Sequence, residues 1–338
     1  MEPTQTVRRL SRLQPAQTNP EVAEAVRKVS GTCQALINEV GKVIVGKRHV
    51  LELVTLNILA AGNILFEDFP GLAKSLMANT FSRASGCDFK RIQFTPDLLP
   101  SDITGIYIYN QRTGEFEFRP GPVFTNFLLA DEINRAPPKT QAALLETMQE
   151  RQVTVEGTTH KLEQPYIVMA TQNPVEQEGT YPLPEAQMDR FLMRLSVGYP
   201  DRDEEVEILR RRMVRRKDDA DTKAVTSPKS IVGMQKVVEQ VYVDTEILRY
   251  IADIVIATRK DPRVYVGSSP RGSLALFKLA RANAAIEGRD YVVPDDVKRV
   301  LKPSIAHRII LRPEPRIKGV TGDHVLDDVV HAVAVPKV

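Results

Sequence analysis

The stretch that decides the fold is Ile64-Leu65-Phe66-Glu67-Asp68-Phe69-Pro70-Gly71-Leu72-Ala73-Lys74-Ser75. A β-branched and aromatic run stops at Pro70-Gly71, and Lys74-Ser75 then opens a segment compatible with a helix. This strand–loop–helix order is typical of a phosphate-binding loop, in which backbone N–H groups and a helix N-terminus surround phosphate oxygens. In such a loop a lysine reaches the terminal phosphates and a hydroxyl holds Mg²⁺, so we assign these roles to Lys74 and Ser75. The residues predicted to contact the nucleotide in this stretch are Asp68, Phe69, Pro70, Gly71, Leu72, Ala73, Lys74, Ser75 and Leu76.

Two positions depart from the usual pattern G-x-x-x-x-G-K-[ST]. Asp68 and Ala73 stand where that pattern has glycine. A carboxylate at position 68 would repel phosphates unless it points away or is paired. If Asp68 faces the phosphates, replacing it with glycine should tighten nucleotide binding. Taken alone, the stretch is also compatible with an ordinary strand–turn–helix that carries a surface lysine.

A second motif, Asn126-Phe127-Leu128-Leu129-Ala130-Asp131-Glu132, is a short apolar run that ends in two acids. Such a run is typical of a strand buried on both faces of a parallel sheet, and its carboxyl end lies where ligands of open α/β folds bind. Successive side chains of a strand point in opposite directions, so the two acids can differ in role. We predict that Asp131 faces the Mg²⁺ ion through water and that Glu132 acts on the water that attacks the γ-phosphate. Solvated acids at a strand end are the alternative.

A third apolar run, Tyr166–Thr171, is followed by Gln172-Asn173-Pro174. An amide at the end of this strand can hold a phosphate oxygen or the attacking water without adding charge. Asn-Pro alone is a common turn. After the two preceding motifs, we interpret Asn173 as a γ-phosphate sensor.

In this order the three motifs resemble Walker A, Walker B and sensor 1 of AAA+ ATPases. The surrounding sequence resembles the MoxR family over about residues 33 to 335. The runs that carry the resemblance are Asp131-Glu132-Ile133-Asn134-Arg135-Ala136-Pro137-Pro138-Lys139-Thr140-Gln141, Leu144-Leu145-Glu146-Thr147-Met148-Gln149-Glu150, Ala170-Thr171-Gln172-Asn173-Pro174 and Pro182-Leu183-Pro184-Glu185-Ala186-Gln187-Met188-Asp189-Arg190-Phe191. The resemblance implies an α/β P-loop AAA+ fold, a parallel sheet flanked by helices with hairpin inserts, and a small all-helical lid domain after it. It also implies ATP and Mg²⁺ as cofactors, and alanine at position 73 is usual in such chains.

The resemblance assigns further roles to residues outside the three motifs. Val45 and Gly46 lie in a segment like the one that packs on the adenine base. Arg190 resembles the arginine finger that AAA+ subunits offer to a neighbour's nucleotide, although Arg194 could take that role and Arg190 could instead form a structural ion pair. Arg271 follows a Ser-Pro helix start and resembles sensor 2, which contacts the γ-phosphate as the lid closes.

Two hairpins are predicted between the motifs. In the first, Ile106–Tyr109 and Glu115–Arg119 flank a turn that contains Gly114. In the second, Gln152–Val155 and Thr158–Leu162 flank Glu156-Gly157. MoxR-like and chelatase-like proteins carry inserts at these places that project toward the pore and the substrate of a ring. Two exposed hairpins that merely brace the sheet are the alternative.

The domain organisation follows from composition and periodicity. Residues 1–28 show no periodic pattern of apolar residues and are predicted to be a mobile leader. Residues 29–216 are predicted to form the nucleotide-binding domain. A polar linker over 217–230 leads to the helical lid at 231–338. Within these parts, Asp201 and Glu204 fit a capping box. Leu248, Ile251 and Val255 are predicted to share a buried helix face.

Composition limits the function classes. The chain has 338 residues, 42% of them hydrophobic, and a net charge of +3, so no strong field for nucleic acid is expected. No apolar run is long enough to span a membrane, and no signal-peptide core begins the chain. Cys33 and Cys87 lack metal-site spacing. These features favour a cytoplasmic protein.

Three functions are compatible with the sequence. The leading one is a MgATP-hydrolysing ATPase that works as a homo-oligomer, by resemblance a hexameric ring, and remodels or matures partner protein complexes. The resemblance also implies a partner that carries a von Willebrand factor A domain, and nothing in these residues identifies a protein client. The alternatives are a nucleotide-dependent binding switch with little turnover and a DNA-acting AAA+ motor.

Overall fold

The computed structural model describes residues 20–174, 180–217 and 220–336. The chain divides into two compact units, an N-terminal unit of residues 34–233 and a C-terminal unit of residues 234–336 together with residues 20–33. Residues 1–19 of the predicted leader lie outside the described part. Helix α2 (Pro20–Gly41) begins inside that leader and buries Val26 and Val29, so the prediction of an aperiodic leader is wrong for residues 20–28.

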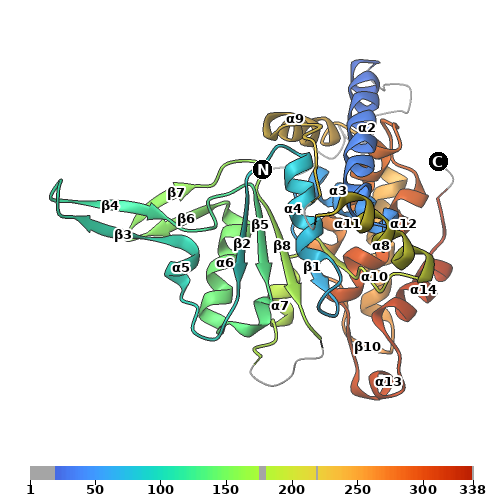
Figure 1. Ribbon diagram of the computed structural model, residues 1–338. Helices are drawn as coiled ribbons and strands as arrows, with labels where there is room; N and C mark the ends of the chain where they lie inside the picture. Colours follow the sequence, from blue (N-terminus) through green and yellow to red (C-terminus); the bar gives the residue numbers. More distant parts are fainter. Residues whose placement is uncertain (1–19, 175–179, 218–219, 337–338) are drawn as a thin grey trace, which may run out of the picture. The chain divides into compact units, whose positions relative to one another are not determined.

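The N-terminal unit is built on a five-stranded parallel sheet with the order β2–β5–β8–β1–β9 (Figure 1). The strands are β1 (Ile64–Glu67), β2 (Phe89–Gln93), β5 (Phe127–Asp131), β8 (Ile167–Gln172) and β9 (Met193–Leu195). The central strands are buried on both faces, which is why their sequences are continuous apolar runs. The predicted parallel sheet is confirmed.

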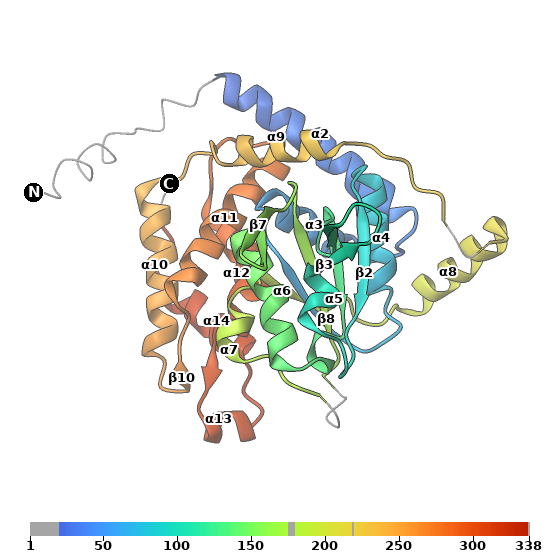
Figure 2. The same cartoon turned by 90° about the vertical axis from the view of Figure 1, so that its left-hand side faces the viewer.

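Helices cover both faces of this sheet. Figures 1 and 2 show α6 (Pro138–Glu150) on one face and α3 (Arg48–Leu59) with α4 (Lys74–Ala84) on the other. The core on the α6 side joins alternate strand residues such as Leu128 and Val168 to Leu144 of the helix. The remaining short elements and the last helix of this unit are α5 (Pro100–Thr104), the 3₁₀ turn η2 (Ile133–Arg135), α7 (Glu185–Met188) and α8 (Arg202–Arg215).

Both predicted hairpins are present. They are β3 (Gly105–Asn110) with β4 (Glu115–Pro120), and β6 (Gln152–Val155) with β7 (Thr158–Lys161). Aromatic side chains pack the two hairpins together. His160 of β7 stacks on Phe118 of β4 with 4.0 Å between ring centroids, and Tyr107 of β3 lies beside both rings. At the far end of the first hairpin, Tyr109 and Phe116 contact each other and remain exposed.

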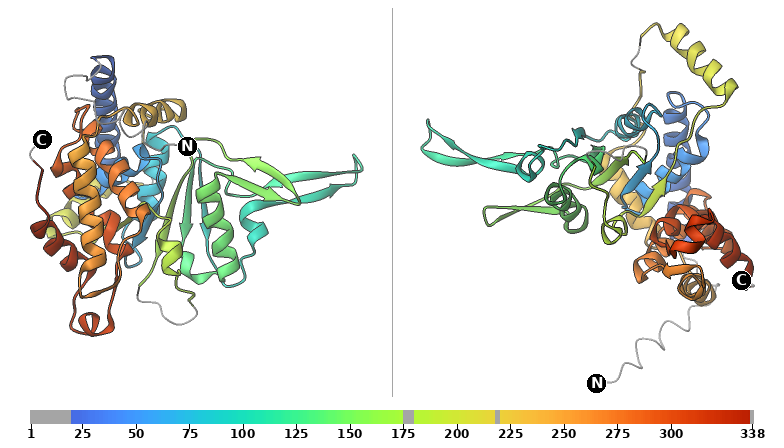
Figure 3. Two further views of the ribbon diagram at one scale, coloured as in Figure 1. Left: turned by 180° about the vertical axis from the view of Figure 1, so that it is seen from behind. Right: turned by 90° about the horizontal axis from the view of Figure 1, so that it is seen from below.

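The C-terminal unit is mostly helical, as predicted for the lid (Figure 3). Its helices and its 3₁₀ turn are α10 (Thr245–Lys260), α11 (Pro270–Ile286), α12 (Pro294–Ile305), η3 (Ala306–Arg308), α13 (Pro313–Ile317) and α14 (Gly322–Ala332), and α9 (Pro228–Val238) leads into it. A short antiparallel ribbon, β10 (Val264–Val266) with β11 (Ile310–Leu311), is an addition that the helical periodicity did not indicate. On the N-terminal side, the Ser30 hydroxyl donates to the Ile286 carbonyl, 2.6 Å away, and so ties the first half of α2 to this unit.

The local predictions in these helices have mixed outcomes. Asp201 and Glu204 form the predicted capping box at the start of α8, with each side chain accepting from the other residue's backbone N–H. Leu248 is exposed, so its predicted place on a buried face is wrong. Ile251 and Val255 are buried as predicted, and Ile247 rather than Leu248 lies with them on the buried face of α10. None of the described helices is both long and apolar enough to cross a membrane.

The predicted linker of residues 217–230 is described except for residues 218 and 219. It lies along the N-terminal unit at Val225, whose N–H donates to the carbonyl of Ala84 at the end of α4. Helix α9 begins at Pro228, inside the predicted linker, and the boundary between the compact units falls within that helix, after residue 233.

The fully buried Gln141 generates a prediction about stability. Its Nε2 atom lies 2.9–3.1 Å from the carbonyl oxygens of Ile133, Ala136 and Tyr181, which fastens the segment after β5 to α6. Gln141→Met keeps the shape but leaves these buried carbonyls without their donor, so the free energy of unfolding should fall by about 1–3 kcal/mol in chemical denaturation. The exposed Gln111→Met in the first hairpin turn is the matched control and should stay within about 0.5 kcal/mol of the wild type.

Candidate active site

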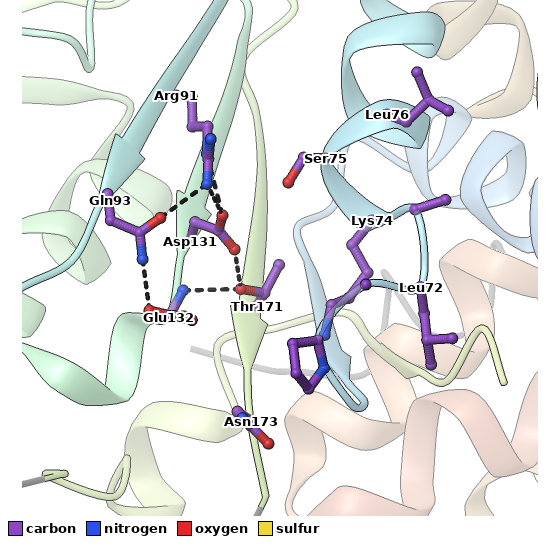
Figure 4. A pocket seen from close by; sticks show the side chains of 13 residues that line it. Leu72, Lys74, Ser75, Leu76, Arg91, Gln93, Asp131, Glu132, Thr171 and Asn173 are labelled. Atoms are coloured by element: carbon purple, nitrogen blue, oxygen red, sulfur yellow. Dashed lines mark hydrogen bonds and ion pairs between the residues drawn. The ribbon is translucent and has the colours of Figure 1, made fainter. Parts of the chain in front are cut away.

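The carboxyl ends of β1, β5 and β8 meet at one edge of the sheet, where a cavity of about 400 Å³ opens. Figure 4 shows the side chains that point into it. The lining residues are Pro70, Gly71, Leu72, Ala73, Lys74, Ser75, Leu76, Arg91, Gln93, Asp131, Glu132, Thr171 and Asn173. The structure therefore brings together ten of the predicted site residues: the loop residues 70–76, which include Lys74 and Ser75, with Asp131, Glu132 and Asn173.

The loop after β1 has the backbone of a phosphate cradle. Gly71 and Ala73 both have positive φ angles, 83° and 56°. The general phosphate-loop pattern has glycine at the place of residue 73 because this left-handed conformation costs other residues about 1–2 kcal/mol. Ala73 carries that strain with the smallest side chain that has a Cβ atom. Helix α4 starts immediately afterwards, so its free N–H groups face the cavity.

Lys74 is buried at the base of the cavity. Its ammonium donates to the carbonyl oxygens of Asp68, 2.7 Å away, and Phe69, 3.0 Å away. Burial lowers the pKa of this lysine, and the negative charges of Asp68, Asp131 and Glu132 oppose that shift. A triphosphate entering the cavity would add the anion that the ammonium is placed to meet.

The Asp68 carboxylate is paired, which resolves the two alternatives left by the sequence. Its Oδ2 atom accepts from the backbone N–H groups of Val197 and Gly198 and from the Ser196 hydroxyl, all in the segment that follows β9. Its Oδ1 atom accepts from the Phe69 N–H at 3.2 Å. Asp68 and Phe69 do not line this cavity, and their carbonyl oxygens accept from the Lys74 ammonium. Their nucleotide contacts stay predictions.

Asp131, at the end of β5, is held on both of its oxygens. The Thr171 hydroxyl of the neighbouring strand donates to Oδ1 at 2.6 Å. The Arg91 guanidinium of β2 donates to Oδ2 through Nε at 3.1 Å and Nη2 at 2.6 Å (Figure 4). Two neighbouring strands thus fix the orientation of this carboxylate.

Glu132 follows with a left-handed backbone, φ 56° and ψ 50°, which turns the chain into η2. Its N–H donates to the Thr171 hydroxyl at 2.8 Å. Its Oε2 atom accepts from the Gln93 amide at 2.6 Å and pairs with Arg135 at 3.2 Å. Because both partners reach Oε2, Oε1 is the oxygen that can take a proton from a water in the cavity.

The residues present fit a magnesium ion. Ser75 and Asp131 offer a hydroxyl and a carboxylate in one cavity, and Mg²⁺ is usually bound by one or two carboxylates, waters and substrate phosphates rather than by a protein cage. The described residues contain no group of three or more His, Cys, Asp or Glu side chains placed to hold a metal ion by themselves. Oδ1 of Asp131 accepts one hydrogen bond and so retains a lone pair for a metal-bound water.

A second cavity, of about 330 Å³, adjoins the first through Gly71, Leu72, Ala73 and Leu76. Part of its wall is aliphatic, with Val45 and Ile208, and this part suits the flat apolar face of a base. The lining also includes the basic residues Lys47, Arg211, Arg212 and Arg215. Gly46 does not line this cavity. A Cβ atom at that position would lie 1.9 Å from the Glu204 side chain, so this glycine allows Glu204 to pack close and pair with Lys47.

The predicted arginines lie outside the lining of both cavities. Arg190 follows α7, and its Nε atom is buried without a hydrogen-bond partner in the described part of the chain. Arg194 pairs with Glu67 on the adjacent strand β1, with 2.8 Å between Nη1 and Oε2. Arg271 begins α11 in the C-terminal unit behind the predicted Ser269 cap. The roles assigned to Arg190 and Arg271 stay predictions.

Sequence reasoning missed three side chains that line the first cavity: Arg91, Gln93 and Thr171. Thr171 lies in a recognised strand and could have been assigned from its place before Asn173. Arg91 and Gln93 alternate with the buried Ile92 along β2, and this period-two pattern places them on the same side of an edge strand. No residue-level signal indicated that this side faces Asp131.

Comparisons with known proteins agree with this geometry. Residues 63–193 match the family described as ATPase family associated with various cellular activities (AAA), and residues 256–329 match the AAA lid domain. The chain is 43% identical to Chaperone MoxR1 of Mycobacterium tuberculosis, over 94% of this chain and 86% of that one. It is 48% identical to the uncharacterized protein YeaC of Bacillus subtilis, over 89% and 93% of the two chains. The crystal structure of a candidate ATPase from Cytophaga hutchinsonii superposes with a TM-score of 0.87 at 41% identity, covering 93% of this chain and 98% of that one.

The fold and the cavity together define a P-loop protein of the AAA class, with a nucleotide-binding domain followed by a lid domain. Within that class, the chain belongs to the MoxR family of AAA+ ATPases.

The pairing of Asp68 yields a prediction about nucleotide affinity. Asp68→Gly should weaken MgATP binding several-fold or leave it unchanged, because the segment after β9 loses the acceptor for two backbone N–H groups and the loop loses an anchor. Calorimetric titration with a non-hydrolysable ATP analogue measures this. Asp68→Asn, which keeps one oxygen acceptor and removes the charge, separates the two effects. Tighter binding by both variants would show instead that the charge of Asp68 acts on the phosphates.

Proposed function

We propose that this chain binds MgATP and hydrolyses it as an assembled ring, and that it couples turnover to the remodelling or maturation of partner protein complexes. The observation that carries the proposal is the convergence of Lys74, Asp131, Glu132 and Asn173 on one cavity. A nucleotide-dependent switch with little turnover and a DNA-acting motor remain the competing functions, and the experiments below discriminate the first of them directly.

In the proposed bound state, the base occupies the aliphatic cavity beside Val45, and the phosphates lie along the loop over residues 70–75. Lys74 exchanges its carbonyl contacts for the terminal phosphates, and N–H groups at the start of α4 bind phosphate oxygens. Ser75 and Asp131 would hold the Mg²⁺ ion, which supplies positive charge to the β- and γ-phosphate oxygens. Arg271 is proposed to reach the γ-phosphate as the lid closes.

Hydrolysis is assigned to Glu132 and Asn173. Glu132 Oε1 accepts a proton from the attacking water, while the contacts with Gln93 and Arg135 hold the carboxylate in place. The Asn173 amide positions that water or the γ-phosphate without adding charge. Positioning and electrostatics are the main contributions a protein makes to phosphoryl transfer. Glu132 and Asn173 supply the positioning of the attacking water, and positive charge from outside the cavity lining is still needed for the full rate.

Assembly is inferred from the arginines. Arg190 does not line its own chain's cavity, which is compatible with a role at a neighbour's nucleotide. Arg194 is engaged by Glu67, and this favours Arg190 of the two candidates. A homo-oligomer, taken as a hexameric ring from the family resemblance, is therefore part of the proposal.

The chaperone-like role is supported by likeness and by one surface feature. A relative with 43% identity is named a chaperone. The first hairpin presents exposed Tyr109 and Phe116 on a rigid two-stranded support, and such aromatic side chains are enriched at protein interfaces. A partner with a von Willebrand factor A domain is carried over from the resemblance alone, and the client has no assignment.

The catalytic assignment predicts a separation of binding from turnover. Glu132→Gln should lower steady-state phosphate release by about 10²–10⁴-fold and leave MgATP binding intact, because it removes a base and no phosphate contact. Lys74→Ala should lose both. The exposed Glu146→Gln on α6 makes the same change of charge and should behave as wild type. Residual turnover near the wild-type rate in Glu132→Gln would contradict the assignment, and a wild type that binds but does not turn over would favour the switch.

The proposed trans arginine predicts a dependence on protein concentration. Specific ATPase activity should rise as the chain assembles, and Arg190→Ala should lower turnover about 10³-fold or more while sparing binding. A mixture of the two variants tests this directly. Arg190→Ala subunits have intact pockets and Glu132→Gln subunits have intact arginines, so a mixed assembly should regain part of the activity. A mixture as inactive as its components would argue against supply of Arg190 in trans, and loss of folding in Arg190→Ala would show a structural role.

A further inference from the structure

Arg91 is the one arginine in the lining of the phosphate cavity among the described residues. It comes from β2, and its guanidinium makes two hydrogen bonds to Oδ2 of Asp131, at 3.1 Å from Nε and 2.6 Å from Nη2. Nη2 also donates to Oε1 of Gln93 at 2.9 Å. Figure 4 shows this guanidinium between β2 and the acid at the end of β5, on the side of the cavity that faces Ser75. A second cation therefore lies at the carboxylate that the magnesium ion needs.

The lone pairs of Asp131 limit how it can serve both cations. An ionised carboxylate offers about four acceptor sites, two on each oxygen. Arg91 fills both sites of Oδ2, and the Thr171 hydroxyl fills one site of Oδ1. A water bound to Mg²⁺ then has a single site left on Oδ1, unless Arg91 moves away.

Arg91 is able to move. About half of its side-chain surface is exposed, whereas the Asp131 side chain is 13% exposed. The guanidinium stays charged at every physiological pH, so it cannot make room by losing a proton. Charge repulsion between a guanidinium and a divalent cation that share one carboxylate lowers the affinity of each for that carboxylate.

We propose that Arg91 is a positioning residue that competes with Mg²⁺ for Asp131, and that it sets the Mg²⁺ concentration at which nucleotide becomes tightly bound. The inference rests on the proposed MgATP site and adds a residue to it. If Asp131 turned from Arg91 to a bound Mg²⁺ ion, the Arg91 guanidinium would also loosen its hold on Gln93, whose amide donates to Glu132. Arrival of the metal is thereby linked to the proposed base through Arg91 and Gln93.

The test is the Mg²⁺ dependence of binding, which is separate from turnover. Binding of a fluorescent ADP analogue is titrated over a series of free Mg²⁺ concentrations, with an EDTA arm that contains no Mg²⁺. Arg91→Gln should lower the half-saturating Mg²⁺ concentration by about three- to tenfold, as expected for removing one positive charge near a divalent ion in a wet site. Arg91→Lys, which keeps the charge and loses the paired geometry, should fall between Arg91→Gln and the wild type.

Lys90→Gln is the matched control. Lys90 precedes Arg91 on β2, is exposed, and points to the opposite side of the strand, so this variant removes the same charge without touching Asp131. Its Mg²⁺ dependence should equal that of the wild type.

Three outcomes overturn the inference. An unchanged or higher Mg²⁺ requirement in Arg91→Gln means that Arg91 does not compete with the metal. Weaker binding of the analogue by Arg91→Gln in EDTA means that Arg91 contacts the nucleotide directly. An equal shift in Lys90→Gln means that the effect is general charge on β2. If the wild type binds no nucleotide at any Mg²⁺ concentration, the proposed function itself fails, and the two failures are thus distinguishable.

Discussion

Strand β8 pairs in parallel with β1 on one side and with β5 on the other, and the geometry of the cavity depends on this pairing. Neighbouring strands are about 4.8 Å apart, so the loop after β1 and the acids after β5 are separated by about 10 Å. That separation leaves room for a phosphate chain and a metal ion between Lys74 and Asp131, with Asn173 emerging between them from β8. The buried Asn63 strengthens the arrangement, because its side-chain oxygen accepts from the Val168 N–H and ties the start of β1 to β8.

Around this cavity, each charge has a partner within the protein. The Asp68 carboxylate is satisfied by N–H groups, Lys74 by loop carbonyls, Asp131 by Arg91 and Glu132 by Gln93 with Arg135. Leaving any of these groups buried and unpaired would cost free energy, and the pairing fixes their directions before a ligand arrives. Ligand binding is then an exchange of partners, so the affinity for nucleotide and metal is set by differences between contacts that already exist.

Much of this arrangement could be predicted from the sequence because it is local. The apolar runs that end in Lys74-Ser75, Asp131-Glu132 and Asn173 identify the strands, and parallel strands bring their carboxyl ends together. What could not be predicted depends on contacts between segments far apart in the chain. Whether Asp68 repels phosphates depends on the N–H groups that follow β9, and the position of Arg91 depends on which strand lies beside β5. The start of α2 at Pro20 was missed for a similar reason, since Val26 and Val29 are buried and the neighbouring Ser30 donates to the carbonyl of Ile286, far along the chain.

The phosphate cavity holds few positive charges to balance the negative charges of a triphosphate. Among the described residues that line the phosphate cavity, the cations are Lys74 and Arg91, and Arg91 is committed to Asp131. A triphosphate carries several negative charges, and in the transition state charge spreads further over the transferring oxygens. One lysine and one magnesium ion would neutralise only part of that charge. The remainder has to come from groups outside the cavity lining, and the proposed contributions of Arg271 and Arg190 would supply it from the lid and from a neighbouring copy. Under that proposal, the chemistry cannot reach its full rate in an isolated nucleotide-binding domain, and hydrolysis is coupled to lid closure and assembly by the need for charge.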